Sequence, residues 1–369
     1  YQALGLAAYL AGVWLAGQAL GRSALTVPRH SASHAPARLA VRWQLDLAVA
    51  AALAISLAAA AGIIVMTGGT PLANLGQRHS LSGYLFNLAE VGWVAAVWWN
   101  FDRWQRSGRL SGVGIALFFA VAAMLALLAY RTPLMTMALA AALGFHRLVR
   151  PLRLRHMVSL GVALLIFAGA YGWLRLQHTQ RYGRYRDYLA LTDLKWSPLE
   201  PIAPLAATVR EGSVVLSRLV ANVPDKHPFQ HGGVTFSTVA TLLPGWQRGP
   251  REWIGILARD LEHSTTPTIL GFLYVDFGVP GIIAGMALFG AFLTWLWDLA
   301  LRRQTLLALW LWAYFTAAFL LSIHTGFADL RHGVLTVFAI GLAWASSPRP
   351  WAWLCAAPET GRTAARQRG

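Results

Sequence analysis

Arginine dominates the charged residues of this chain, with 29 arginines against two lysines. Its guanidinium group binds phosphate oxygens through two parallel hydrogen bonds and stays charged in any surroundings. Five arginines are candidates for such binding: Arg131, Arg210, Arg218, Arg248 and Arg251. Arg210 and Arg218 are eight residues apart, roughly 80° around an α-helix, so they can flank one site. For each arginine taken singly, a solvated surface is the alternative.

A histidine offers the complementary chemistry, which is the removal of a proton from a hydroxyl group. His263 directly precedes an apolar segment, and an imidazole that titrates near neutrality can act as a general base. Further polar residues are candidates to contact the same substrate: Lys226, Thr265, Thr266, Tyr274 and Asp276. For Asp276, a structural role agrees equally well with the sequence.

The sequence predicts no metal and no cofactor. His227 and His231 have a spacing that could bind zinc, but Pro228 argues against a helix between them, and no third ligand is evident. Cys355 is the only cysteine of the chain, which excludes an intramolecular disulfide and a cysteine-based metal site.

These residues belong to a strongly apolar chain. Of its 369 residues, 56% are apolar and 12% are charged, against an ordinary charged share of about 25%, and the mean hydropathy is +0.49. This composition excludes a soluble enzyme, a disordered tail and a nucleic-acid-binding module, in spite of a net charge of +16. We therefore predict an all-α, polytopic membrane protein.

Nine apolar stretches meet or approach the roughly 20 residues that a membrane-crossing helix needs. They lie near 2–21, 43–67, 83–101, 111–130, 132–145, 157–175, 267–300, 305–323 and 333–347. The fifth stretch is short enough to be a tilted or partial span. The seventh is too long for one straight helix, and because proline removes an amide donor and clashes with the preceding turn, we expect a break near 278–281.

The placement of arginines predicts the orientation in the membrane. One set of short loops, together with the tail, holds 17 arginines, whereas the opposite short loops hold three, namely Arg78, Arg131 and Arg331. The arginine-rich side is therefore predicted to be cytoplasmic. The chain then divides into about six spans (1–175), a large outer loop (176–265), further spans that include the broken one (266–347) and a basic cytoplasmic tail (348–369).

This orientation puts all five candidate arginines on the outer side at about membrane level, where a lipid-linked diphosphate is the natural ligand. Within the outer loop, the apolar spacing predicts a helix over 203–221. Gly232–Gly233 is predicted to be a turn, and 251–263 is predicted to be an amphipathic helix along the membrane surface.

Two charged residues within or between the spans have alternative roles. Arg131 stands between two apolar segments, where it either reaches the interface with its long side chain or binds substrate. Glu90 lies near the middle of its span, with Asn87 one turn away on the same face. For Glu90 we favour a pairing with another helix over a catalytic role.

The order of these features resembles a known family. An Arg-x-Pro-Leu stretch at 131–134 is followed by GGVTFSTVATLLPGW (232–246) in the outer loop and by HSTTPTILGFLYVDFGVPGIIAGMALFG (263–290) after it. Over about 120–281, the chain is similar to the oligosaccharide repeat unit polymerases, which are the Wzy-type O-antigen polymerases of the O-antigen ligase and polymerase superfamily. The similarity is most specific at 232–246 and 263–281.

The resemblance implies a metal-independent glycosyltransferase with a GT-C-like fold in the bacterial inner membrane, its large loop periplasmic and its tail cytoplasmic. Such enzymes transfer a growing glycan from undecaprenyl diphosphate to the non-reducing end of a new lipid-linked repeat unit. The implied partners are therefore the donor and acceptor glycolipids, membrane lipids and a chain-length regulator, with no nucleic acid.

The resemblance also implies roles for single residues. Arg131, Arg210 and Arg218 are the best matches to the family's arginines, and His263 stands where the related ligases place a histidine before the following span. This chain has Ser264 after the histidine, where those ligases have an asparagine. That departure weakens a ligase assignment and also weakens a role of His263 as the base.

Three alternatives to a polymerase stay open at this point. An O-antigen ligase would transfer the glycan to lipid A core in place of a repeat unit. A transporter or flippase of an anionic glycolipid should show internal repeats with paired broken helices, whereas the sequence has one predicted break and no repeat. A non-catalytic scaffold subunit has no specific feature in its favour.

Overall fold

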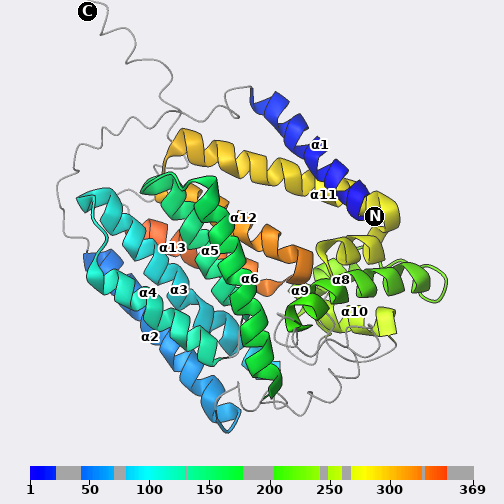
Figure 1. Ribbon diagram of the computed structural model, residues 1–369, viewed down its shortest axis with the longest axis horizontal. Helices are drawn as coiled ribbons and strands as arrows, with labels where there is room; N and C mark the ends of the chain where they lie inside the picture. The colour runs from blue at the N-terminus through cyan, green and yellow to red at the C-terminus, as the bar shows by residue number, and fades with distance from the viewer. Residues whose placement is uncertain are drawn as a thin grey trace, which may run out of the picture.

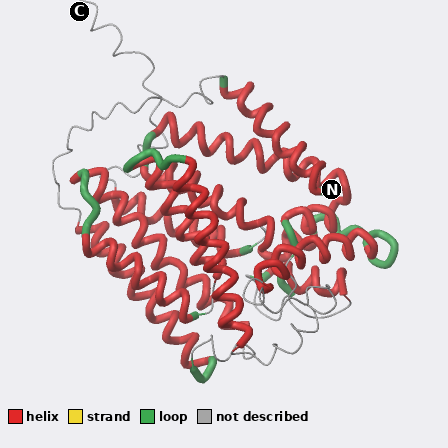
Figure 2. Tube along the Cα trace, in the orientation of Figure 1, coloured by secondary structure: helices red, strands yellow, loops and turns green. Residues whose placement is uncertain are grey.

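The computed structural model describes residues 1–21, 43–69, 80–128, 131–177, 203–241, 248–259, 267–325 and 329–346. Within these ranges every regular element is a helix, which confirms the predicted all-α class. The helices are α1 (Gln2–Leu20), α2 (Trp43–Met66), α3 (Ser80–Ser107), α4 (Gly112–Leu127), α5 (Arg131–Leu148), α6 (Leu154–Gln177), α8 (Ala203–Asn222), α9 (Gly233–Ala240), α10 (Pro250–Arg259), α11 (Ile269–Arg303), α12 (Leu306–Thr325) and α13 (Leu330–Ser346). Figures 1 and 2 show a bundle of long helices with the shorter α8, α9 and α10 gathered beside the start of α11.

Several helices have the length and composition of membrane spans. Four are long and apolar enough to cross a bilayer, namely α1, α2, the Leu154–Tyr171 part of α6, and α11, and shorter apolar segments lie in α4, α12 and α13. Large apolar side chains such as Leu57 and Val65 of α2 are exposed, and a helix that is apolar on all sides is typical of a membrane span. These helices support a multi-pass membrane protein, whereas the count of nine spans and the GT-C-like fold stay predictions.

Helix α11 is broken where the sequence predicts a break. Its 35 residues would extend for roughly 50 Å as a straight helix, well beyond the roughly 30 Å of a bilayer core. Gly278 leaves helical geometry with φ 65° and ψ −150°, a conformation that is almost restricted to glycine. Pro280 follows and lacks the amide hydrogen that would continue the helix. The predicted break near 278–281 is therefore confirmed.

The largest apolar core lies between α2, α3, α5, α12 and α13. Its bulkiest members are Trp93 and Trp98 of α3 and Trp310 of α12, none of which is more than 1% exposed. Helices α2 and α3 approach closely where Ser56 meets Gly92, a position at which a Cβ atom would collide with the serine. This core fixes α3 against α12 and α13, which carry the polar residues described below.

Helix α1 lies along α11, a neighbour that the sequence analysis did not predict (Figure 1). A Cβ atom added at Gly12 would meet the backbone of Ala287, so glycine is what permits this approach. Small residues let membrane helices come close and gain van der Waals contact. At the far end of the pair, Nη2 of Arg302 donates to the carbonyl of Leu20 at 2.8 Å. The first helix is therefore packed onto the broken one.

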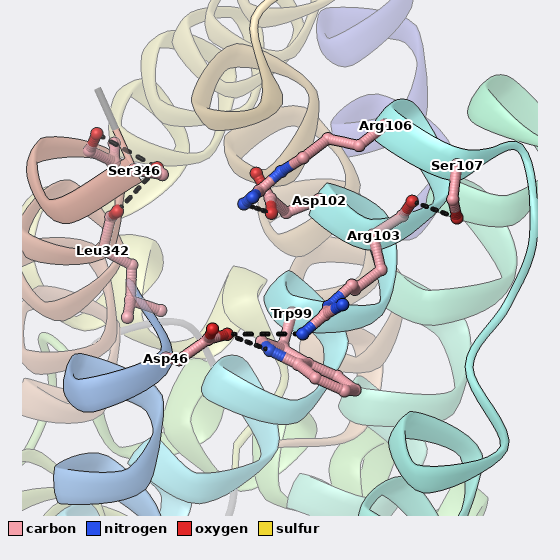
Figure 3. A network of polar contacts seen from close by, with 9 residues as sticks. Asp46, Trp99, Asp102, Arg103, Arg106, Ser107, Leu342 and Ser346 are labelled. Carbon is pink, nitrogen blue, oxygen red and sulfur yellow. Dashed lines mark hydrogen bonds and ion pairs between the residues drawn. The ribbon is translucent and has the colours of Figure 1, made fainter. Parts of the chain in front are cut away.

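Polar contacts join α2 and α3 where α3 ends (Figure 3). Asp46 accepts a hydrogen bond from Nε1 of Trp99 at 2.8 Å, and Nη2 of Arg103 lies 3.8 Å from the same carboxylate. One turn further, Asp102 forms an ion pair with Arg106. Following the arginine count, we call this the inner end of the molecule, and we call the end where α6 ends and α11 begins the outer end.

Candidate functional site

Helices α8, α9 and α10 form an assembly on the outer part of α11, called here the outer assembly (Figure 1). Val215 and Leu219 of α8 are buried against Ile254 and Leu257 of α10. Nδ2 of Asn222 donates to the carbonyl of Leu257 at 3.0 Å and ties the end of α8 to α10. The helix predicted at 203–221 is confirmed as α8, and the one predicted at 251–263 is present over Pro250–Arg259.

The cationic candidates occupy different surroundings in the structure. Arg210 and Arg218 are exposed on α8, and Lys226 is exposed in the turn after it. Arg248 is half-buried, with its guanidinium carbon 5.8 Å from the centre of the Trp253 ring. Arg131 is the half-buried first residue of α5 and belongs to the helical bundle. The outer assembly thus carries the loop cations, and Arg131 comes from a separate part of the fold.

Asp276 is buried next to the break in α11 and caps the start of α9. Its carboxylate accepts hydrogen bonds from the amides of Val234 at 3.0 Å and Thr235 at 2.9 Å, and from the hydroxyl of Thr235 at 2.5 Å. A carboxylate at this position satisfies amides that have no partner within their own helix. The structure therefore gives Asp276 a structural role, which is one of the two roles that the sequence left open. Gly232–Gly233, predicted as a turn, begins α9.

The segment before α9 is held by the carbonyl groups that the break exposes. The amide of Gln230 donates to the carbonyl of Val275 at 3.0 Å, and the amide of His231 donates to the carbonyl of Asp276 at 2.9 Å. In an unbroken helix the carbonyl of Asp276 would accept from residue 280, but Pro280 has no amide hydrogen. The loop therefore supplies the missing donor, and the break in α11 is what anchors α9.

Tyr274, another candidate, is buried between α11 and the end of α8. Its hydroxyl donates to the carbonyl of Val223 at 3.0 Å, and its ring makes edge contacts with Tyr1 and Phe229. These contacts support the packing of the outer assembly. The remaining candidates, His263, Thr265 and Thr266, lie outside the described residues.

A chain of alternating charges crosses from the outer assembly into the bundle. Nη2 of Arg251 on α10 lies 3.1 Å from Oδ2 of Asp329, which precedes α13. Oδ1 of Asp329 accepts from the amide of Arg331 at 3.1 Å. Nη1 of Arg331 lies 3.9 Å from Oε1 of Glu90 on α3. The pairing between helices that was favoured for Glu90 is therefore present.

The two ends of this charge chain differ in exposure. The side chains of Arg251 and Asp329 are 36% and 26% exposed, whereas those of Arg331 and Glu90 are 5% and 2% exposed. Burial by itself would raise the pKa of Asp329, but the guanidinium groups of Arg331 and Arg251 outweigh it and hold the pKa below its usual range. The chain thus runs from a partly open ion pair to a fully enclosed carboxylate.

Sequence reasoning did not identify Asp329 or Arg331 as site residues. Arg331 was considered only as one of three arginines in the outer short loops. The signal that could have identified it is Asp329, an acidic residue two positions before it at the start of an apolar helix. His332 follows, and its Nδ1 lies 2.7 Å from the hydroxyl oxygen of Tyr314. Across the described ranges, no group of three or more His, Cys, Asp or Glu side chains could hold a metal ion.

Comparison with known proteins identifies one family. A family model described as "Putative O-antigen polymerase" matches residues 3–336, which run from the start of α1 into α13. Comparisons with curated proteins and with solved structures gave no match.

Proposed function

Because the chain belongs to the O-antigen polymerase family, we propose that it polymerises undecaprenyl-diphosphate-linked oligosaccharide repeat units at the periplasmic face of the bacterial inner membrane. The family match is the observation that carries this function, since it indicates a glycosyltransferase-like enzyme of polysaccharide synthesis. A multi-pass protein with a helical assembly beside a broken span suits such a reaction, because both substrates are attached to membrane lipid.

In the proposed reaction, a hydroxyl group of the acceptor sugar attacks the anomeric carbon of the donor glycan. The new carbon–oxygen bond forms as the bond to the diphosphate breaks, and the leaving diphosphate takes the electron pair. Negative charge therefore grows on the diphosphate, and cationic donors fixed beside it lower the barrier. The acceptor hydroxyl gives its proton to a base, for which His263 is the sequence-based candidate.

We assign the diphosphate to arginines of the outer end. Arg210 and Arg218 support this because they share the exposed side of α8, and a guanidinium group matches phosphate oxygens with two donors. Arg131 and Arg248 are further donors in this proposal. Since these groups supply the positive charge, the reaction is proposed to proceed without a metal ion.

An apolar surface beside the break is the proposed path of the undecaprenyl chain. Phe236 and Val239 of α9 are exposed, and so are Phe277, Val279 and Ile283 around the break in α11. Because α11 has the length and composition of a membrane span, this surface continues its lipid-facing side. A lipid tail lying there would bring its diphosphate to the outer assembly.

The outer location of α8–α10 is part of the proposal and has its own test. Ala190→Cys and Thr360→Cys, each in a Cys355→Ser background, are to be labelled in intact cells with a membrane-impermeant thiol reagent. We expect labelling of residue 190 and protection of residue 360, because the arginine count puts the tail in the cytoplasm. The reverse pattern would contradict the proposed face of the reaction.

The function itself is tested with purified protein in lipid nanodiscs and a synthetic undecaprenyl-diphosphate repeat unit. We expect a ladder of products that differ by one repeat unit, and we expect the ladder to persist in EDTA. Transfer of a single glycan to added lipid A core, with no ladder, would indicate a ligase instead. Intact glycolipid recovered without any product would contradict the enzyme assignment.

A further inference from the structure

The carboxylate of Glu90 is the least satisfied buried charge among the described residues. Its side chain is 2% exposed, and its nearest cation, Nη1 of Arg331, is 3.9 Å away. The indole N–H group of Trp93 interacts with the carboxylate, but neither carboxylate oxygen has a partner with full hydrogen-bond geometry within the described part of the chain. Buried polar atoms in native proteins nearly always have a partner, so each exception calls for a ligand, a water or a functional reason.

The contrast with Asp276 shows what a purely structural carboxylate looks like in this protein. Asp276 is equally enclosed, but it accepts three hydrogen bonds from α9. If Glu90 served only to neutralise Arg331, a direct hydrogen bond between the two side chains would be the favourable arrangement, because a charged group left without one keeps its desolvation penalty. Glu90 thus retains the capacity to accept hydrogen bonds from something else.

Glu90 adjoins aromatic residues of the largest core, which belong to the residue types that sugar sites use. One turn along α3, Trp93 lies 6.2 Å from Trp310 and 6.0 Å from Tyr314, measured between ring centres. The indole nitrogen of Trp310 is buried and has no acceptor among the described residues, and that of Trp93 interacts with the Glu90 carboxylate without full hydrogen-bond geometry. Sugars present hydroxyl groups, which donate to carboxylates and accept from indole N–H groups, and apolar C–H faces, which pack against aromatic rings.

We propose that Glu90 binds the attacking hydroxyl group of the acceptor sugar and takes its proton, an assignment that rests on the proposed polymerase function. The O–H bond of the acceptor breaks and its proton passes to the Glu90 carboxylate. The oxygen forms its bond to the anomeric carbon of the donor, and the diphosphate leaves with the electron pair. Glu90 then returns the proton to water. In this assignment Glu90, not His263, is the catalytic base.

Access to Glu90 runs along the charge chain. The outer members, Arg251 and Asp329, form a partly exposed ion pair between the outer assembly and the bundle. A partly exposed pair of this kind contributes about 1 kcal/mol, so a ligand that offers other partners can separate it. Separation of α10 from Asp329 would open the way to Arg331 and, behind it, to Glu90.

The experiment compares single-turnover rates of chain extension in nanodiscs for the wild-type protein and Glu90→Gln. Glutamine keeps the shape and an oxygen acceptor but cannot take the proton. We expect the rate of extension to fall by about 100-fold or more, while the dissociation constant for a donor glycolipid changes by less than about threefold. Glu90→Asp should recover part of the rate, because it restores the carboxylate at a shorter reach.

A matched control is available on the same helix. Asp102 is also a buried carboxylate paired with an arginine, at the inner end of α3. Asp102→Asn removes the same charge from the same element, so it reports any general effect of charge loss on the bundle. We expect it to extend chains within about threefold of the wild-type rate once matched for folded protein by thermal unfolding.

Several results would overturn the role of Glu90. Full activity of Glu90→Gln would mean that the carboxylate binds an internal water or only Arg331. Recovery of activity in a Glu90→Gln, Arg331→Gln double variant would show that neutralising the arginine is its whole task. A large loss in His263→Ala with none in Glu90→Gln would return the base to His263. A wild-type protein that makes no ladder contradicts the proposed function itself and, with it, this assignment.

Discussion

The outer assembly differs from the contact between α3 and α13 at Glu90 and Arg331, called here the seam, in how its charged groups are satisfied. At the outer assembly, Asp276 of α11 accepts three hydrogen bonds from α9, and Arg210 and Arg218 of α8 are exposed. At the seam, Glu90 and Arg331 are both buried and lie 3.9 Å apart, and no described residue gives the carboxylate a hydrogen bond of full geometry. The difference teaches that burial alone does not identify a functional charge. The useful distinction is whether the surrounding protein supplies the hydrogen bonds that the charge needs.

The largest expected effect is on stability, and it comes from Asp276. Asp276→Ala leaves the amides of Val234 and Thr235 without their acceptor. Two buried donors without a partner should lower the free energy of unfolding by about 3 kcal/mol. Denaturant unfolding in detergent should show this loss, with proteolysis increasing near α9. Thr235→Val removes only the hydroxyl bond and should cost about 1 kcal/mol. If Asp276→Ala unfolds like wild type but stops chain extension, Asp276 belongs with Glu90 and the comparison fails.

A comparable effect, on activity alone, is expected at the exposed arginines of α8. Alanine at Arg210 or Arg218 should lower the rate of chain extension by about 100-fold if each donates to the leaving diphosphate. Unfolding of Arg218→Ala should be unchanged, because that side chain is exposed. Lysine should restore little, since it lacks the two-pronged donor geometry. The control is Arg155→Ala, which removes an exposed arginine at the inner end. An equal loss of extension rate in this variant would mean that the α8 arginines act only as part of a general charged surface.

A smaller effect is expected from Gly278, which sharpens the idea that the break anchors α9. With φ 65° and ψ −150°, an alanine there would be strained by about 2 kcal/mol, and its Cβ atom would also come within 3.0 Å of the Phe229 ring. We expect Gly278→Ala to lower the free energy of unfolding by about that amount. Gly333 on α13 has no atom close to an added Cβ, so Gly333→Ala should be close to neutral in the same assay.

The smallest effect is expected at the link between the two regions. Arg251→Ala breaks the ion pair with Asp329. Both side chains of this pair are partly exposed, and such pairs contribute about 1 kcal/mol to stability. We expect a small change in unfolding and a change of a few-fold in chain extension. An increased extension rate would support the view that this pair hinders access to Glu90. A loss as large as that of Arg218→Ala would instead place Arg251 on the diphosphate.

Much of the helical framework could be predicted from hydropathy because a lipid environment leaves the backbone few choices. Within a bilayer, every amide and carbonyl must bond inside its own segment, so an apolar stretch of sufficient length becomes a helix. The break in α11 was predictable for the same local reason, since Pro280 cannot donate and Gly278 tolerates a rare conformation. The apolar spacing over 203–221 likewise predicted α8.

The candidate site was less predictable, because its chemistry depends on partners far away in the chain. Tyr274 and Asp276 were selected as candidate substrate contacts, and the structure shows that they also form hydrogen bonds with Val223 and with the start of α9, which the sequence did not reveal. Asp329 was not predicted as a candidate, because in the sequence it is a single acidic residue before an apolar stretch. Its importance becomes visible only where Arg251 and Arg331 meet it.

The sequence by itself therefore determined the class of the protein, the position of its apolar helices, the break in α11 and the resemblance to repeat unit polymerases. These follow from composition, local backbone chemistry and contiguous motifs. Only the tertiary structure decided which charges are satisfied. Whether Glu90 or Asp276 finds donors depends on which helices pack beside it, and that packing is a property of the whole fold. The sequence alone does not distinguish a helical carboxylate that caps a neighbouring helix from one that binds a substrate.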